Sequence, residues 1–187
     1  RRFVNWWNSR WVSLYARQGR GRAMRMISSN NDHDNTPWML PDGRIVYMRW
    51  EYVDRSQVHL HHLWSMYPDG TGQMVYFGNQ FPDTAMLDAK PIPGMNKVVA
   101  SFSPGHGRPG HMGLTTVIDP RTGPDKRAAG KRISRPGRYY RDPYPISEQC
   151  FLVADNAGIH VMDGQGNTDL LCRPSSEQPV LTCHEPR

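Results

Sequence analysis

The last residues of the chain have the most specific chemical pattern. Val180-Leu181-Thr182-Cys183-His184 has the spacing of a c-type haem site. In such a site two cysteines bond the porphyrin vinyl groups and the adjoining histidine ligates the iron. Val180 stands where the first cysteine would be, so the motif is degenerate and a double thioether is excluded. One thioether from Cys183, with His184 beside it, leaves haem c open as a cofactor.

Two histidines further up the chain have a spacing that suits a metal ion. His59 and His61 lie in the segment 57–64, which has the apolar content of a strand. Side chains two residues apart on a strand share a face, so two neutral imidazoles could converge on one metal. The sequence specifies no third ligand. A metal pair and two hydrogen-bonded surface histidines both remain open as interpretations.

Another pair of histidines, His106 and His111, lies in the segment 103–113, which is rich in glycine and proline. Such a loop allows the backbone to approach a neighbouring group closely. That group could be another domain, an anion or a haem. A long loop between strands without any ligand remains the alternative interpretation.

Motifs of common catalytic sites are absent from the sequence. It contains no Gly-x-Ser-x-Gly, no phosphate-binding loop and no His-Glu-x-x-His. Asp32 and Asp34 could offer oxygens to calcium, but the twelve-residue loop pattern is missing. Aspartate at such a position typically caps a turn. We therefore expect no catalytic residues and no catalytic activity in this segment alone.

The elements that must position these residues follow a repeat. Three apolar strand cores, 45–48, 98–101 and 151–154, are each 53 residues apart. A polar reversal precedes each core, and a second apolar strand with an Asp/Gly turn follows it. Short strands with turns at this period are typical of β-propeller blades. The chain is thus predicted to be all-β, a partial β-propeller of about three four-stranded blades plus part of another.

This repeat also predicts the strands nearest the propeller axis and the core. The inner strands are expected near 44–49, 97–102 and 150–154, with almost no helix elsewhere. Side chains that should be largely buried between blades are Trp38, Ile45, Tyr47, Leu63, Trp64, Val98, Val117, Phe151, Val153 and Val161.

The order of proline, aromatic residue, Pro-Asp-Gly and apolar strand resembles the TolB-like propeller repeats of bacterial extracytoplasmic proteins. More narrowly, the segments 32–47, 87–94, 103–107 and 183–187 are similar to the middle, propeller domain of the hydrazine synthase alpha subunit and its planctomycete-type relatives. This resemblance implies a periplasmic or equivalent compartment. It also implies a haem motif before Glu-Pro-Arg, which is degenerate here.

The repeat divides the chain into expected units. Because a propeller closes with about four to eight blades, and the chain begins without methionine or a signal peptide, we expect a segment of a longer protein. The expected units are 1–35, the outer strands of a partial blade; 36–82, a blade; 83–138, a blade with a basic loop; 139–173, a blade; and 174–187, the tail with the haem-type motif.

Charge and cysteine content set the remaining expectations. Residues 1–31 contain seven arginines and no acid, and residues 121–141 contain eight Lys or Arg against one Asp. An acidic surface of another domain or subunit is the expected complement, and nucleic acid is not. No window approaches the roughly 18 apolar residues of a membrane span. Cys150, Cys172 and Cys183 form no zinc pattern, and their redox state stays open.

Two functions remain for the parent protein. The first is a propeller scaffold within a larger extracytoplasmic, haem-associated redox protein that resembles the hydrazine synthase alpha subunit. The second is a non-catalytic TolB-like module that binds a protein or peptide partner. A haem absorbance spectrum distinguishes the two hypotheses.

Overall fold

The structure is a computed structural model, and it describes residues 12–18, 22–51, 60–105, 111–174 and 182–186. Strands dominate these residues, and they form one two-stranded and three four-stranded antiparallel sheets. Helix is limited to short 3-10 segments such as η3 (Pro120–Thr122) and η4 (Arg127–Ala129). No helix in the described ranges is long and apolar enough to cross a membrane.

Each four-stranded sheet is a simple meander in which consecutive strands pair. The two-stranded sheet contains β1 (Tyr15–Gln18) and β2 (Arg22–Met26). The first four-stranded sheet contains β3 (Asp34–Met39), β4 (Ile45–Trp50), β5 (His61–Met66) and β6 (Met74–Phe77). The second contains β7 (Ala85–Pro91), β8 (Val98–Ser103), β9 (Leu114–Ile118) and β10 (Gly130–Arg132). The third contains β11 (Arg141–Ser147), β12 (Cys150–Ala154), β13 (Ile159–Asp163) and β14 (Thr168–Cys172).

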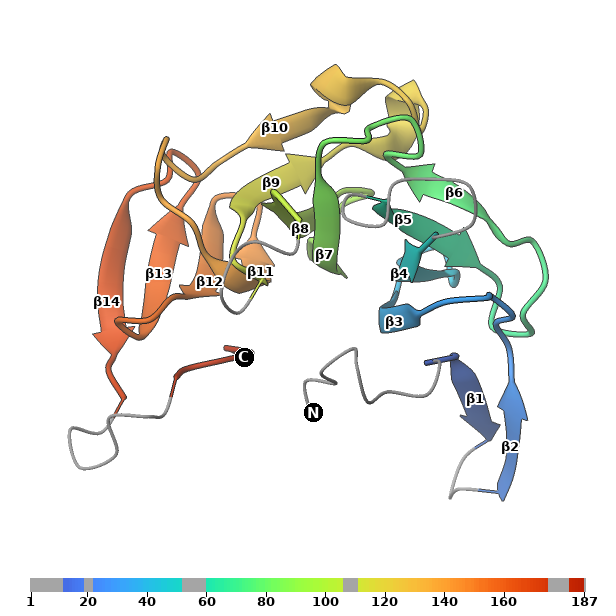
Figure 1. Cartoon of the computed structure of the whole chain (residues 1–187). Helices are drawn as coiled ribbons and strands as arrows, with labels where there is room; N and C mark the ends of the chain where they lie inside the picture. Colours follow the sequence, from blue (N-terminus) through green and yellow to red (C-terminus); the bar gives the residue numbers. More distant parts are fainter. Residues whose placement is uncertain (1–11, 19–21, 52–59, 106–110, 175–181, 187) are drawn as a thin grey trace.

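The sheets stand side by side in an open arc, as Figure 1 shows. Strand β7 packs against both β3 and β11, so the first strand of each meander faces the inside of the arc. The all-β, partial propeller fold predicted from the repeat is therefore confirmed.

The prediction of the inner strands was wrong by one position. The apolar cores at 44–49, 97–102 and 150–154 belong to β4, β8 and β12, which are the second strands of their sheets. A second strand has a neighbouring strand on each side and a neighbouring sheet on at least one face, so its sequence is the most apolar. The strand nearest the axis is bonded on one side only and carries proline and polar residues.

Three apolar interfaces hold the arc together. Val46 and Val98 belong to the interface between the first and second sheets. Val99 and Phe151 belong to the interface between the second and third sheets. Leu14 and Ile27 flank the β1–β2 hairpin and pack with Tyr47 and Met66 of the first sheet.

Most of the predicted core is buried. Tyr47, Leu63, Val98, Val117, Phe151 and Val153 are buried, whereas Trp38, Ile45, Trp64 and Val161 are only half-buried. Val161 alternates with the buried Met162 on β13 and therefore lies on the opposite face of the third sheet. No described sheet covers that face.

The first strand of each meander has the same irregularity. Thr36, Asp88 and Asp142 have positive φ angles of 51°, 53° and 51°. In each case the register with the next strand shifts at this point, as expected for a β-bulge. A bulge increases the local twist and redirects the side chains beside it. The repeat therefore places a bulge at the same level of the three strands that face the axis.

Two buried side-chain interactions link neighbouring strands of the first sheet. The Arg49 guanidinium donates to both oxygens of Asp34, at 2.8 and 3.0 Å, and lies 4.5 Å from the Trp64 ring centroid. The indole of Trp50 stacks between His33 and His61, with ring centroids 5.5 and 5.1 Å away. The expected turn-capping role of Asp34 is therefore replaced by a buried ion pair.

We predict that Asp34→Ala lowers the free energy of unfolding by about 3 kcal/mol, because it leaves the Arg49 charge buried without its carboxylate. Asp83→Ala is the matched control, since Asp83 forms the same two-bond pair with Arg127 while both side chains are more than half exposed. Asp83→Ala should lower the free energy of unfolding by less than about 1 kcal/mol. Urea unfolding followed by tryptophan fluorescence measures both. An equal loss of unfolding free energy in Asp34→Ala and Asp83→Ala would contradict a special role for the buried pair.

We also predict that acid destabilises the chain through His33. Burial lowers the pKa of His33, against the opposing pull of Asp32 and Asp34. Its Nδ1 accepts a hydrogen bond from the Val12 N–H at 3.2 Å, which requires the neutral ring. The unfolded chain therefore binds the proton more readily. The stabilisation is complete above the unfolded pKa of about 6.5 and is lost as the pH falls through the lowered folded pKa.

The control for this pH effect is His33→Asn, whose side-chain oxygen can replace Nδ1 as acceptor but does not titrate. Urea midpoints compared at about pH 7.5 and about pH 5 should fall more for the natural sequence than for the variant. An equal fall in both proteins would show that another group is responsible.

Candidate functional site

The inner face of the arc brings equivalent residues of the three blades together. Trp38, Lys90 and Tyr144 each lie two residues beyond a bulge. The rings of Trp38 and Tyr144 meet edge to face at a centroid distance of 6.2 Å, and the Lys90 Nζ lies 5.7 Å from the Trp38 ring. Lys90 is buried. The Trp38 ring therefore contacts both the Lys90 cation and the Tyr144 ring, and these contacts link the three axial strands.

The C-terminal tail is attached to the bulge of the third blade. The carboxylate oxygen Oδ2 of Asp142 lies 3.1 Å from His184 Nδ1 and accepts the Glu185 backbone N–H at 3.0 Å. Asp142 itself is buried. A hydrogen on Nδ1 makes the other ring nitrogen, Nε2, an acceptor. That Nε2 lies 3.1 Å from the Thr182 hydroxyl.

Arg141, next to this aspartate, is a buried cation with neutral partners. Its side chain is close to fully buried, and one guanidinium nitrogen donates to the Asn156 amide oxygen. A second nitrogen lies 3.5 Å from His184 Nε2. Its Nε has no acceptor, and no carboxylate of the described residues lies within ion-pair distance. The surroundings of His184 are therefore positively charged on one side and anchored by a carboxylate on the other.

The predicted site residues are only partly brought together. Cys183 is a free, half-buried thiol beside His184. His111 is exposed, with a φ of 53°, and Gly113 after it bonds to Tyr140, the residue before Arg141. His59 and His106 lie outside the described residues.

The proposed metal pair has a different environment from the one the sequence suggested. His61 is buried and stacks on the Trp50 ring, and His62 beside it contacts the Phe81 carbonyl oxygen through Nε2 at 2.9 Å. Within the described ranges no three His, Cys, Asp or Glu side chains gather closely enough to hold a metal. Metal binding by His59 and His61 stays a prediction.

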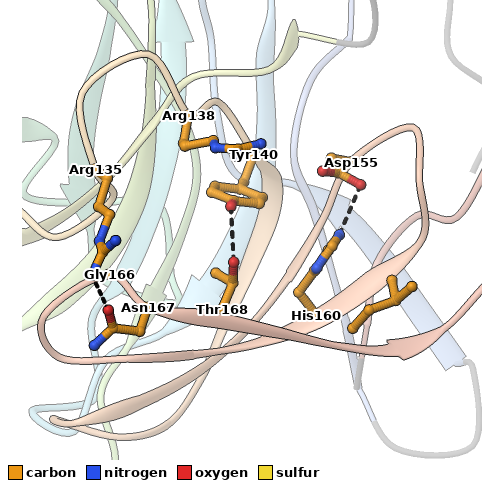
Figure 2. Close-up of a pocket in the computed structure, with 9 residues that line it drawn as sticks. Arg135, Arg138, Tyr140, Asp155, His160, Gly166, Asn167 and Thr168 are labelled. Carbon is orange, nitrogen blue, oxygen red and sulfur yellow. Dashed lines mark hydrogen bonds and ion pairs between the residues drawn. The ribbon is translucent and has the colours of Figure 1, made fainter.

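The structure also contains a polar hollow that sequence reasoning missed. It has a volume of about 400 Å³ and lies between the segment 133–140 and the β13–β14 hairpin (Figure 2). Figure 2 shows two arginines on one side and the pair His160 and Asp155 on the other, with the Asp155 oxygen 2.8 Å from His160 Nε2. Its lining residues are Arg135, Arg138, Tyr140, Asp155, His160, Gly166, Asn167, Thr168 and Leu170.

Comparison with known proteins establishes the fold. No protein-family model and no curated protein matches the chain. Among solved structures, hydrazine synthase from Kuenenia stuttgartiensis superposes with a TM-score of 0.68 and 20% identity over 81% of this chain. Puromycin hydrolase superposes with a TM-score of 0.54 and 19% identity over 78% of it.

The chain has the fold of a propeller segment. It spans 21% of the hydrazine synthase chain and 23% of the puromycin hydrolase chain, about a fifth to a quarter of each. The resemblance to hydrazine synthase that the sequence segments suggested is confirmed, and at this identity it concerns the fold alone.

We predict that Asp142→Gly releases the C-terminal tail. Glycine keeps the positive φ without strain but removes the acceptor for His184 and Glu185. The half-buried Cys183 should then react several-fold faster with iodoacetamide, because local opening exposes its thiol. Peptide mass spectrometry measures the rate, with the exposed Cys172 as the internal reference. Asp142→Asn keeps one acceptor oxygen, so its Cys183 reaction rate should lie between those of the natural chain and Asp142→Gly. An unchanged Cys183 rate would contradict this anchoring.

Proposed function

We propose that this chain is the propeller scaffold of a larger, extracytoplasmic, haem-associated redox protein, and that it presents Cys183 and His184 to a haem. The observation that carries this proposal is the contact between Asp142 and His184 Nδ1. Histidines that ligate a metal typically donate their second ring N–H to a carboxylate, which fixes the tautomer and the ring orientation. The Asp142 contact would keep the proton on Nδ1 and so leave Nε2 as the unprotonated, ligating nitrogen.

The donor set fits a haem held by a single thioether. Cys183 is the neighbour of His184 and carries a free thiol. Nε2 contacts the hydroxyl of the exposed Thr182 and the Arg141 guanidinium, and both would have to move aside for iron to bind at this nitrogen. Arg141, whose partners among the described residues are neutral, would supply a cation for an acidic group of the haem. When bound, the haem would supply one-electron chemistry.

The remaining parts of the proposal follow from the arc. A scaffold needs surfaces that other domains or subunits can cover, and the third sheet has an uncovered apolar face with Ile146 50% and Leu171 59% exposed. Similarity to a chain of which the match covers only 21% supports a place within a larger chain. The extracytoplasmic location is the one that the resemblance to hydrazine synthase implies.

Covalent haem attachment tests the proposal. The chain is exported in a bacterial host that contains a cytochrome c maturation system. The expected result is a Soret band that survives acid-acetone extraction, that Cys183→Ser abolishes and that His184→Ala weakens or shifts. Cys172→Ser, a cysteine outside the tail, should leave the spectrum unchanged.

A positive control makes a negative result informative. Val180→Cys restores the two-cysteine motif and should raise the yield of bound haem. If that variant binds haem and the natural chain does not, the single-thioether site is wrong. If neither binds haem, the haem association fails, and a TolB-like module that binds a protein or peptide partner becomes the better function.

A further inference from the structure

The hollow in Figure 2 has a pair of exposed arginines at its edge. Arg135-Pro136-Gly137-Arg138 forms a turn in which the Arg138 N–H donates to the Arg135 carbonyl at 3.1 Å and Gly137 has a φ of 78°. Proline at the second position and a positive φ at the third define a type II turn. Both arginines therefore leave the ends of one turn, close together in space.

Among the described residues, no carboxylate neutralises the positive charge of this pair. Arg135 donates through one nitrogen to the Asn167 amide oxygen, which is a neutral partner. Neither Arg135 nor Arg138 has a described carboxylate within ion-pair distance. The one acid that lines the hollow, Asp155, accepts through Oδ1 from the backbone N–H groups of Ala157 and Gly158 and lies 2.8 Å from His160 Nε2.

The opposite wall is rigid and polar. Asp163 accepts the backbone and side-chain N–H groups of Asn167, at 2.9 and 2.6 Å, so the Asn167 oxygen is held toward Arg135. The hydroxyls of Tyr140 and Thr168 lie 3.3 Å apart. Gly166 fixes the turn against the segment 133–135, because a Cβ there would lie 2.3 Å from the Ile133 carbonyl oxygen. The hairpin cannot move away without breaking these contacts.

We propose that this hollow binds the phosphate or sulfate group of a small molecule. Guanidinium groups bind oxoanions through paired N–H donors, and hydroxyl groups add further donors. At about 400 Å³ the hollow is larger than the anion alone and lies within the size range of small-molecule sites. The Tyr140 ring and the Leu170 side chain form an apolar wall for the rest of the ligand.

Titration calorimetry of the 187-residue chain tests this site, with inorganic phosphate, inorganic sulfate and phenyl phosphate as probes. Phenyl phosphate should bind more tightly than inorganic phosphate, because its ring reaches the apolar wall. Arg135→Gln combined with Arg138→Gln should weaken the binding of both phosphates by about tenfold or more, since the charged hydrogen bonds to the anion are lost. A preference between phosphate and sulfate identifies the anion.

The matched control removes two charges from the same basic segment but outside the hollow. Lys131 and Arg132 are exposed and do not line it, so Lys131→Gln with Arg132→Gln should leave binding nearly unchanged. Equal weakening in the two double variants would show attraction by net charge and would overturn the site. The site would also be overturned if the chain bound poly-glutamate but no small anion, and if the Arg135 and Arg138 variant lost that binding. The hollow would then dock an acidic protein segment. Absence of binding to any probe would overturn it too. Haem binding at His184 has no part in this test.

Discussion

Every four-stranded sheet of this chain has an apolar second strand that must be covered by neighbouring sheets. Along β8 the side chains alternate, so that Val98 and Ala100 face the first sheet while Val99 faces the third. A single sheet of this kind could not be stable in water, because burial of both faces supplies most of its stabilisation. The arrangement of the blades follows from this constraint, since each sheet is positioned by the sheets that pack against it.

The outer faces of the first and third sheets, at the two ends of the arc, are covered to different extents. At the first sheet, Leu14 and Ile27 beside the β1–β2 hairpin cover Tyr47 and Met66. The buried pair of Asp34 and Arg49 lies near this junction, where it fixes the orientation that apolar packing alone leaves loose. On the third sheet, no described strand covers the face that carries Leu152 and Val161, which stay half-buried. That face is the surface that the proposed larger protein would have to cover.

The sequence predicted the blades well because their signal is local and repeated. Apolar cores and turns recur at a fixed spacing, and this spacing needs no knowledge of distant contacts. It did not identify the axial strands, since Thr36-Pro37 and Asp142-Pro143 look like turns although they are bulges within strands. The burial of an aspartate such as Asp34 was also missed, because its partner Arg49 is fifteen residues away and contacts it only across the pair β3–β4.

The candidate site was also predicted only in part, because it depends on a contact between residues far apart in the sequence. Cys183-His184 could be recognised from its spacing, but the residue that orients His184 is Asp142, forty-two positions earlier. Its equivalents in the other blades are Thr36 and Asp88, so a structural position that recurs in every blade serves in one of them to anchor the tail. A positive φ costs about 1–3 kcal/mol for most residues and less for aspartate, which tolerates the left-handed region. The propeller repeat therefore creates the bulge in each blade, and in the third blade the aspartate at the bulge anchors the tail.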